Sequence, residues 1–285
     1  MRIAITGANG QVGQELVRAL SPTHTIIPLT HADVALEVRS AVDHLVALRP
    51  EYVVHAAAWT DVDGCARDRE RALLVNGIGT QHVALACQHL DIPLLYISTN
   101  EVFDGTANQP YLEFDRPAPI NAYGYSKWAG EQIVQQLLTR CAIVRISWVF
   151  GGSRNFVRTI LRLAQERTQL SIVSDEIGSP TYAPDLAHAV SRLIAQEAYG
   201  IFHLINEGVC SRFEFAQEII AQMGYTNIQL NPIPLALYQR DSTPPRYSAL
   251  RNFVAAVDLG IQLRPWQAAL ADFLEAIHKE EHTSP

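Results

Sequence analysis

The chain has 285 residues, of which 48% are hydrophobic and 18% are charged, and its formal net charge at pH 7 is −7. This composition is typical of a globular protein with a sizeable core, and the negative charge gives no basic field for nucleic acid or anionic lipid. No apolar run is long enough to span a membrane, and a strand-like run begins directly after Met1, so we expect a cytoplasmic protein without nucleic-acid or membrane partners.

The four cysteines are far apart in the sequence and form no Cys-x-x-Cys pair; they are Cys65, Cys87, Cys141 and Cys210. This spacing is not that of a disulfide framework or a zinc site. We therefore predict reduced, buried thiols and no bound metal.

Up to residue 147, strand-like apolar runs alternate with helical stretches. The predicted strands are 2–6, 25–29, 52–56, 94–98 and 142–146, and the predicted helices are 14–20, 38–48, 71–90 and 127–138. Asn76 is a poor helix former inside one of these helices, so we expect it to make a buried structural hydrogen bond. Regular alternation is typical of a parallel sheet covered on both faces. The sequence therefore predicts an α/β fold with a Rossmann-type doubly wound parallel sheet.

Beyond residue 147, proline and glycine become more frequent, and helices are predicted at 156–166, 184–196, 212–223 and 266–279. A strand-like run at 200–205 is expected to return to the main sheet, so the two parts of the molecule are interleaved in sequence. We predict a Rossmann domain over residues 1–147 plus about 180–206. A smaller α/β lobe, the candidate for substrate binding, is predicted over about 148–179 and 207–285.

Glycines follow the first predicted strand in the spacing G-x-x-G-x-x-G, at Gly7, Gly10 and Gly13. Such a turn lets the backbone approach a pyrophosphate and presents amide N–H groups at a helix N-terminus. A tight turn without a ligand is the alternative. We predict a dinucleotide site, with Gln11 and Val12 in the same turn.

Two later segments are candidates for further cofactor contacts. An acid at the end of the second strand would bind the ribose of NAD, and this chain has Thr30-His31 there, so we expect NADPH, with NADH possible. Asp33 and Val34 are expected beside the adenine, although a solvent-facing turn is the alternative for Asp33. Small residues after the third strand would let the cofactor cross the strand ends, or would serve helix packing. That segment adds three candidate contacts: Ala58, Trp59 and Thr60.

Tyr123 and Lys127 lie four positions apart, which places both on one face of a helix, shortly after a strand that ends near Thr99. We expect the Lys127 cation to lower the pKa of the Tyr123 phenol and make it a usable proton donor. A phenol, an ammonium and a hydroxyl that meet at one carbonyl are the groups needed for carbonyl reduction. The alternatives are an ordinary surface pair on a helix and a plain strand-end hydroxyl.

Several motifs together resemble those of the extended short-chain dehydrogenase/reductases: the glycine turn, Tyr123-x-x-x-Lys127 and Val144-Arg-x-x-x-Val-Phe-Gly151. Within that class, the chain resembles the dTDP-4-dehydrorhamnose reductase family over nearly its whole length. The segments that match are 10–16, 98–99, 102–105, 121–124, 147–150, 155–156 and 178–181.

The resemblance implies that a reduced nicotinamide converts dTDP-6-deoxy-L-lyxo-4-hexulose to dTDP-L-rhamnose. It implies that Tyr123 donates the proton, that Thr99 hydrogen-bonds the developing oxyanion and that Lys127 binds the nicotinamide ribose. The implied nucleotide-sugar site contains Thr99, Asn100, Trp148 and Asn155, with a core tryptophan as the alternative for Trp148.

The chain departs from the family pattern at three places. Asn100-Glu101 stands where the family commonly has Asp-Tyr, and Pro244-Pro245 stands in place of an Arg-Pro element. Of three acids that hold magnesium between subunits in some members, Glu15 alone matches, since the other positions are Pro184 and Ala276. We therefore expect a monomer or weak homodimer without a metal bridge.

Two other functions are compatible with these residues. One is the reduction or epimerisation of another nucleotide-linked deoxysugar. The other is a non-catalytic regulatory subunit, because a methionine adenosyltransferase regulatory protein resembles this family. The intact set of Thr99, Tyr123 and Lys127 argues against the regulatory subunit.

Overall fold

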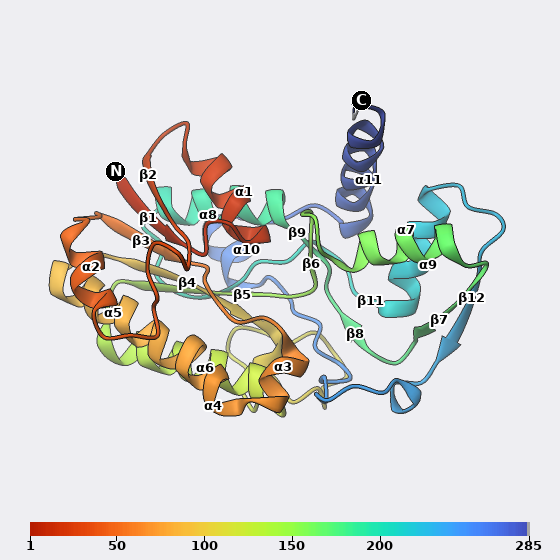
Figure 1. Cartoon of the computed structure of the whole chain (residues 1–285), viewed down its shortest axis with the longest axis horizontal. Coiled ribbons are helices and arrows are strands. Elements are labelled where there is room, and N and C mark those ends of the chain that lie inside the picture. The colour runs from red at the N-terminus through yellow and green to blue at the C-terminus, as the bar shows by residue number, and fades with distance from the viewer. Residues whose placement is uncertain (284–285) are drawn as a thin grey trace.

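A parallel sheet forms the centre of the larger of two lobes in the computed structural model, which describes residues 1–283 (Figure 1). Within this range the sheet has six strands in the order β10-β5-β4-β3-β1-β2, and every neighbouring pair is parallel. The strands are β1 (Arg2–Thr6), β2 (Thr25–Leu29), β3 (Tyr52–His55), β4 (Leu94–Thr99), β5 (Cys141–Ile146) and β10 (Gly200–His203). The predicted Rossmann-type doubly wound sheet is therefore confirmed, and so is the late strand that returns to it.

Helices cover both faces of the sheet (Figure 1). One face carries α1 (Gln11–Leu20), α8 (Ala183–Ala195) and α10 (Val254–Leu259); the other carries α2 (Ala41–Ala47), α5 (Gly79–Leu90) and α6 (Ala122–Leu137). Successive strand residues point to opposite faces, so Ile3 and Ile5 pack in the core beneath α1 and α8, whereas Ala4 packs in the core with α2 and α5. Burial on both sides explains why the strands are continuous apolar runs.

The smaller lobe has its own apolar core. Its helices are α7 (Phe156–Glu166), α9 (Arg212–Gln222) and α11 (Trp266–Thr283). Short strands complete it: β6 (Val149–Phe150) with β9 (Thr181–Tyr182), β7 (Gln169–Val173) with β12 (Gln229–Ile233), and β8 (Ile177–Gly178) with β11 (Cys210–Ser211). Phe150 lies between Phe215 and Phe273 at the centre of this core.

Helix boundaries differ from the sequence prediction in the part of the chain around the candidate site. Helix α6 begins at Ala122, not at residue 127, because the Asn121 side chain caps it by accepting a hydrogen bond from the Gly124 amide at 2.8 Å. The predicted helix 71–90 is divided into α4 (Arg69–Leu73), a π-helical turn (Leu74–Ile78) and α5. Helix α3 (Val62–Arg67) was not predicted.

The cysteines and Asn76 are buried, as the sequence predicts. All the cysteines are buried and free, as predicted. Asn76 is buried in the π-helical turn, where its side chain bonds the main chain of Trp59 and the Ser126 hydroxyl. In the described part of the chain, no helix is both long enough and apolar enough to cross a membrane.

Helix α6 is joined to the sheet by a buried ion pair. The Arg145 guanidinium on β5 donates to both carboxylate oxygens of Glu131, at 3.0 and 2.7 Å, and the two side chains are 2% and 1% exposed. The Ser98 hydroxyl at the end of β4 donates to the same carboxylate at 2.5 Å. The pair therefore fixes the distance between α6 and two adjacent strands.

Replacing Glu131 by Leu should lower the free energy of unfolding by about 3–5 kcal/mol, because it leaves the Arg145 cation buried without its partner. The double variant Glu131→Leu/Arg145→Met should be considerably more stable than the single one, since it removes both charges. Urea unfolding of the three proteins measures the difference. Equal loss in the single and double variants would show that the uncompensated charge is not the cause.

Two fully buried histidines should make the fold sensitive to acid. Burial lowers the pKa of both His55 and His203 from 6.5 to about 3. Below pH 6.5 both histidines bind a proton in the unfolded chain, whereas in the folded chain they stay neutral until about pH 3. As the pH falls from 6.5 to about 3, the free energy of unfolding should therefore decrease by about 1.4 kcal/mol per pH unit for each histidine.

Urea unfolding at several pH values tests this dependence against the variant His55→Gln/His203→Gln. The double variant should show a shallower fall in stability between pH 6.5 and 3. The same slope in both proteins would assign the acid sensitivity to other groups.

Candidate active site

The glycine turn lies at the carboxyl end of β1, where the strand order reverses: β2 pairs with one edge of β1 and β3 with the other. Ligands of open α/β sheets bind at such a switch point. Gly7 has a φ of +68°, and a Cβ there would lie 2.7 Å from the Ala57 backbone. A Cβ at Gly13 would overlap the Gly7 carbonyl. Glycine is therefore required at both positions by the packing of the turn itself.

The same turn has the features that a dinucleotide needs. Gly10 is the N-cap of α1, and no side chain caps this helix, so the amides of its first turn can meet a phosphate. A Cβ at Gly10 would meet one atom alone, the Gly7 carbonyl oxygen at 3.2 Å, so the chain packs loosely on that side. Gln11 and Val12 form the start of the helix. The residues present thus fit a bound pyrophosphate.

The loop after β2 is shaped by Asp33. One of its carboxylate oxygens accepts hydrogen bonds from the Thr30 amide at 2.8 Å and the Thr30 hydroxyl at 2.7 Å, and these bonds lower the pKa of Asp33. Val34 is buried. Asp33 is exposed and held in a fixed position at the strand end, and its contact with an adenine stays a prediction.

The segment after β3 is held by Asn76. The Trp59 amide donates to the Asn76 side chain at 2.8 Å, and the Asn76 amide donates back to the Trp59 carbonyl at 3.1 Å. Arg71 lies over the Trp59 ring, 4.7 Å from its centroid. Ala58 and Trp59 are partly exposed and Thr60 is exposed, so all three are accessible at the strand ends.

The structure brings Thr99, Tyr123 and Lys127 together. Thr99 is the last residue of β4 and Tyr123 is in the first turn of α6, and the Thr99 hydroxyl lies near enough to Tyr123 to act on the pKa of its phenol. Lys127 is one turn further along α6; it is 2% exposed, and its Nζ lies 4.0 Å from the centroid of the Tyr96 ring. The phenol, the hydroxyl and the ammonium therefore belong to one site at the end of β4.

The electrostatics of this site differ from the sequence prediction. The pKa of Tyr123 is raised, chiefly by burial and then by the Glu101 carboxylate, and the Thr99 hydrogen bond opposes the shift. The prediction that Lys127 lowers this pKa is therefore wrong. Burial lowers the pKa of Lys127 itself to about 7, against the opposing effect of Glu131, so its charge is partly lost at neutral pH. A phenol that stays protonated at neutral pH still suits a proton donor.

The predicted substrate residues lie in different settings. Asn100 is buried, and its amide donates to the Ser248 hydroxyl at 2.7 Å. Trp148 is partly exposed and has a φ of +43°. Its ring lies 3.6 Å below the Arg212 guanidinium, and a Cβ at Gly178 would come within 2.5 Å of it. Trp148 is thus fixed at the boundary of the smaller lobe.

Asn155 has a structural contact that the sequence analysis missed. Its side chain caps α7: Oδ1 accepts from the Arg158 amide at 3.1 Å, and the amide donates to the Gly152 carbonyl at 2.8 Å. No hydrogen bond joins it to Thr99 or Asn100 among the described residues.

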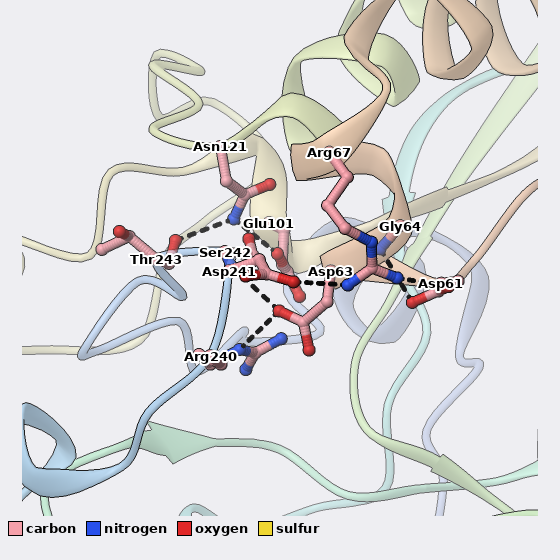
Figure 2. Close-up of polar contacts among 10 residues, drawn as sticks. All are labelled: Asp61, Asp63, Gly64, Arg67, Glu101, Asn121, Arg240, Asp241, Ser242 and Thr243. Atoms are coloured by element: carbon pink, nitrogen blue, oxygen red, sulfur yellow. Dashed lines mark hydrogen bonds and ion pairs between the residues drawn. The ribbon is translucent and has the colours of Figure 1, made fainter.

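A short segment from the smaller lobe, Arg240 to Thr243, crosses to the larger lobe, and we call it the strap (Figure 2). Arg240 and the Ser242 amide both bond Asp63 on α3, at 3.2 and 2.9 Å, and Arg67 of the same helix pairs with Asp241. The strap therefore joins the two lobes beside the candidate site.

Asn121 connects the strap to the site itself. Its amide donates to the Thr243 carbonyl at 3.1 Å and to the Glu101 carboxylate at 2.7 Å, while its Oδ1 caps α6 (Figure 2). Asn121 matches the family pattern and Glu101 departs from it, but neither pattern predicts this network. The one sequence feature that points to this network is Asn121 itself, a residue type that often caps the start of a helix.

The fold and this site define a Rossmann-type protein of the extended short-chain dehydrogenase/reductase class. The family model described as RmlD substrate binding domain matches residues 1–279, and the chain therefore belongs to this family.

Similar proteins match over nearly the whole chain. The spore coat polysaccharide biosynthesis protein SpsK of Bacillus subtilis is 38% identical, with 96% of this chain and 97% of the relative covered. The crystal structure of a dTDP-4-dehydrorhamnose reductase from Clostridium acetobutylicum is 35% identical with a TM-score of 0.95, covering 98% of this chain and 100% of its own. That of the Bacillus anthracis reductase in complex with NADP is 38% identical with a TM-score of 0.93, covering 96% and 99%.

Removing the Asp63 carboxylate should release the strap. We expect Asp63→Ala to increase amide hydrogen exchange across residues 240–243, because the Ser242 amide loses its acceptor. The free energy of unfolding should change by only about 1 kcal/mol or less, since partly exposed ion pairs contribute little. The matched control is Asp43→Ala on α2, far from the strap (Figure 1). Unchanged exchange at Ser242 would show that the strap is held by other contacts.

Proposed function

We propose that the protein reduces dTDP-6-deoxy-L-lyxo-4-hexulose to dTDP-L-rhamnose with NADPH, and that Tyr123 donates the proton. The observation that carries the proposal is the grouping of Thr99, Tyr123 and Lys127 at the carboxyl end of β4, on the same edge of the parallel sheet as the glycine turn after β1. The identity of 35–38% to proteins named dTDP-4-dehydrorhamnose reductase, over nearly the whole chain, supports this substrate.

NADPH is the expected cofactor, with NADH possible. The Bacillus anthracis relative is bound to NADP, and the two residues directly after β2 are Thr30 and His31, where an acid would repel a 2′-phosphate. The pyrophosphate would lie on Gly7, Gly10, Gln11, Val12 and Gly13. The remaining contacts are proposed for Thr30, Asp33, Val34, Ala58, Trp59, Thr60, Tyr123 and Lys127.

The three central side chains have separate roles in the reaction. Bound NADPH supplies a hydride to the carbonyl carbon. Tyr123 gives its phenolic proton to the carbonyl oxygen, which becomes the hydroxyl of the product, and Thr99 hydrogen-bonds that oxygen as its negative charge develops. Lys127, one helical turn beyond Tyr123, binds the nicotinamide ribose. Thr99 and Lys127 are buried and Tyr123 is partly buried, and this low exposure strengthens these interactions.

We propose that the sugar nucleotide is bound by the smaller lobe, predicted over residues about 148–179 and 207–285, while residues 1–147 and about 180–206 hold NADPH. Helix α10, within the second range, packs on the main sheet and so belongs to the larger lobe. The separate apolar core of the smaller lobe supports this division. Thr99, Asn100, Trp148 and Asn155 are the proposed substrate residues. Asn155 would act through its cap of α7, since its side chain is already engaged there.

The protein is proposed to act in the cytoplasm as a monomer or weak homodimer. Glu15 is paired with Arg18 at 2.5 Å, and Pro184 and Ala276 offer no metal ligand. In the described part of the chain, no group of three or more metal-ligating side chains occurs. Neither of the other functions is favoured. A relative named dTDP-4-keto-6-deoxy-D-glucose reductase is 34% identical, but several relatives named dTDP-4-dehydrorhamnose reductase match at 35%, and a regulatory subunit has no need of the complete catalytic set.

Oxidation of NADPH, followed at 340 nm with the 4-keto sugar nucleotide made in situ, tests the proposal. Tyr123→Phe should lower kcat by roughly 100-fold or more, because the developing oxyanion loses its proton donor. The matched control is Tyr125→Phe, an exposed residue on the same helix.

Turnover by Tyr123→Phe at the rate of the wild type would refute the assignment of the proton donor. A wild-type protein that binds NADPH but does not reduce the 4-keto sugar would refute the substrate.

A further inference from the structure

Glu101 is held next to the catalytic groups by its main chain. It lies in the 3-10 turn after β4, where its amide donates to Thr99 Oγ1 at 3.2 Å. On its other side, α6 approaches so closely that a Cβ at Gly124 would overlap the Glu101 carbonyl. Because Tyr123 precedes Gly124, the position of Glu101 relative to both Thr99 and Tyr123 is fixed.

The Glu101 side chain has one oxygen in use and one available. Oε2 accepts the hydrogen bond from the Asn121 amide at 2.7 Å (Figure 2). Oε1 makes no hydrogen bond among the described residues, and it is not one of the buried polar atoms without a partner, so it remains accessible. Glu101 therefore presents a hydrogen-bond acceptor at the site where the two lobes meet.

The charged groups around Glu101 are committed to other partners. Burial and Glu176 raise the pKa of Glu101, and Asn121, Arg240 and Arg212 oppose this shift. Arg212 pairs with Glu176 at 3.1 Å and Arg240 pairs with Asp63 at 3.2 Å. Within the described residues no cation lies within ion-pair distance of Glu101. A partly desolvated carboxylate without a cation is a strong acceptor for a neutral donor such as a hydroxyl.

Asn100, the residue before Glu101, has no free acceptor to offer. The Asn100 amide is bonded to Ser248 and its Oδ1 accepts from the Thr99 hydroxyl at 3.2 Å. Its polar atoms are occupied, whereas Oε1 of Glu101 is not.

We propose that Glu101 is a specificity-determining residue, whose Oε1 accepts a hydrogen bond from the sugar hydroxyl on the carbon next to the carbonyl. This inference rests on the proposed function. In a 6-deoxy-4-keto sugar, C4 lies between C3, which carries a hydroxyl, and C5, which carries a methyl group. A carboxylate accepts a hydrogen bond from the hydroxyl. A methyl group in its place would desolvate the carboxylate without offering a hydrogen bond in return. Glu101 thus sets which way round the ketone lies against Tyr123, and with it the carbonyl face that is reduced.

The test compares two substrates, the 4-keto-6-deoxy sugar nucleotide and its 3-deoxy analogue. The wild type should favour the 3-hydroxyl substrate in kcat/KM by about 10- to 100-fold, the range of one hydrogen bond to a charged group. In Glu101→Ala this preference should fall to a few-fold, mainly through loss of rate with the 3-hydroxyl substrate. Glu101→Gln, which keeps the bond with Asn121, should lie between. Glu166→Gln, on the exposed face of α7, is the matched control.

The outcomes separate this inference from the function on which it rests. If Glu101→Ala keeps the wild-type preference, or loses rate equally with both substrates, Glu101 has a structural effect and the inference is overturned while the reductase stands. If the wild type reduces neither substrate, the proposed function fails and the inference fails with it. Unchanged NADPH affinity of Glu101→Ala, measured by fluorescence, confirms that the variant retains its fold.

Discussion

The candidate site depends on how closely α6 lies against β4. Two glycines on this helix allow the approach, because a Cβ at Gly124 would overlap the Glu101 carbonyl and one at Gly130 would overlap the Tyr96 hydroxyl. The buried pair of Glu131 and Arg145 then fixes the helix laterally against the sheet. Tyr123 and Lys127 receive their positions from these contacts, since both lie on the same rigid element. A larger residue at either glycine would displace the phenol from Thr99.

Burial sets the electrostatic character of the site more than any single ion pair does. It raises the pKa of Tyr123, lowers that of Lys127 and keeps His55 neutral beneath them. Charges on the surface between the lobes are arranged differently: they are partly exposed and paired across the strap. Such pairs are individually weak. The candidate catalytic groups are therefore held by buried packing, while the strap is held across the two lobes by weak, partly exposed ion pairs.

The sequence predicted the features that repeat or that depend on neighbouring residues. The strands of the main sheet were readable because burial on both faces makes them continuous apolar runs, and the glycine turn was readable because packing requires Gly7 and Gly13. The side-chain contacts that join the two lobes were not predicted. The strap meets Asp63 from far along the chain, and no local pattern indicates that contact.

Other errors came from tertiary effects on local signals. The direction of the Tyr123 pKa shift depends on burial, which spacing along a helix does not reveal. Asn76 was correctly expected to make a structural hydrogen bond, but the π-helical turn that carries it was not expected. The family match predicts Asn155 as a substrate residue but gives no sign that its side chain caps α7. The contribution of each residue to substrate binding stays a prediction.

The position of β10 late in the sequence affects when the main sheet can be completed during synthesis on the ribosome. This strand pairs with β5 only after the first half of the smaller lobe has been synthesised, and α8, just before it, packs on the apolar side of α1. The helix that follows the glycine turn therefore lacks its cover until about 195 residues have left the ribosome. A nascent chain of this protein exposes the apolar side of its nucleotide-binding half through most of translation, a period in which hydrophobic surface is open to aggregation or to chaperones.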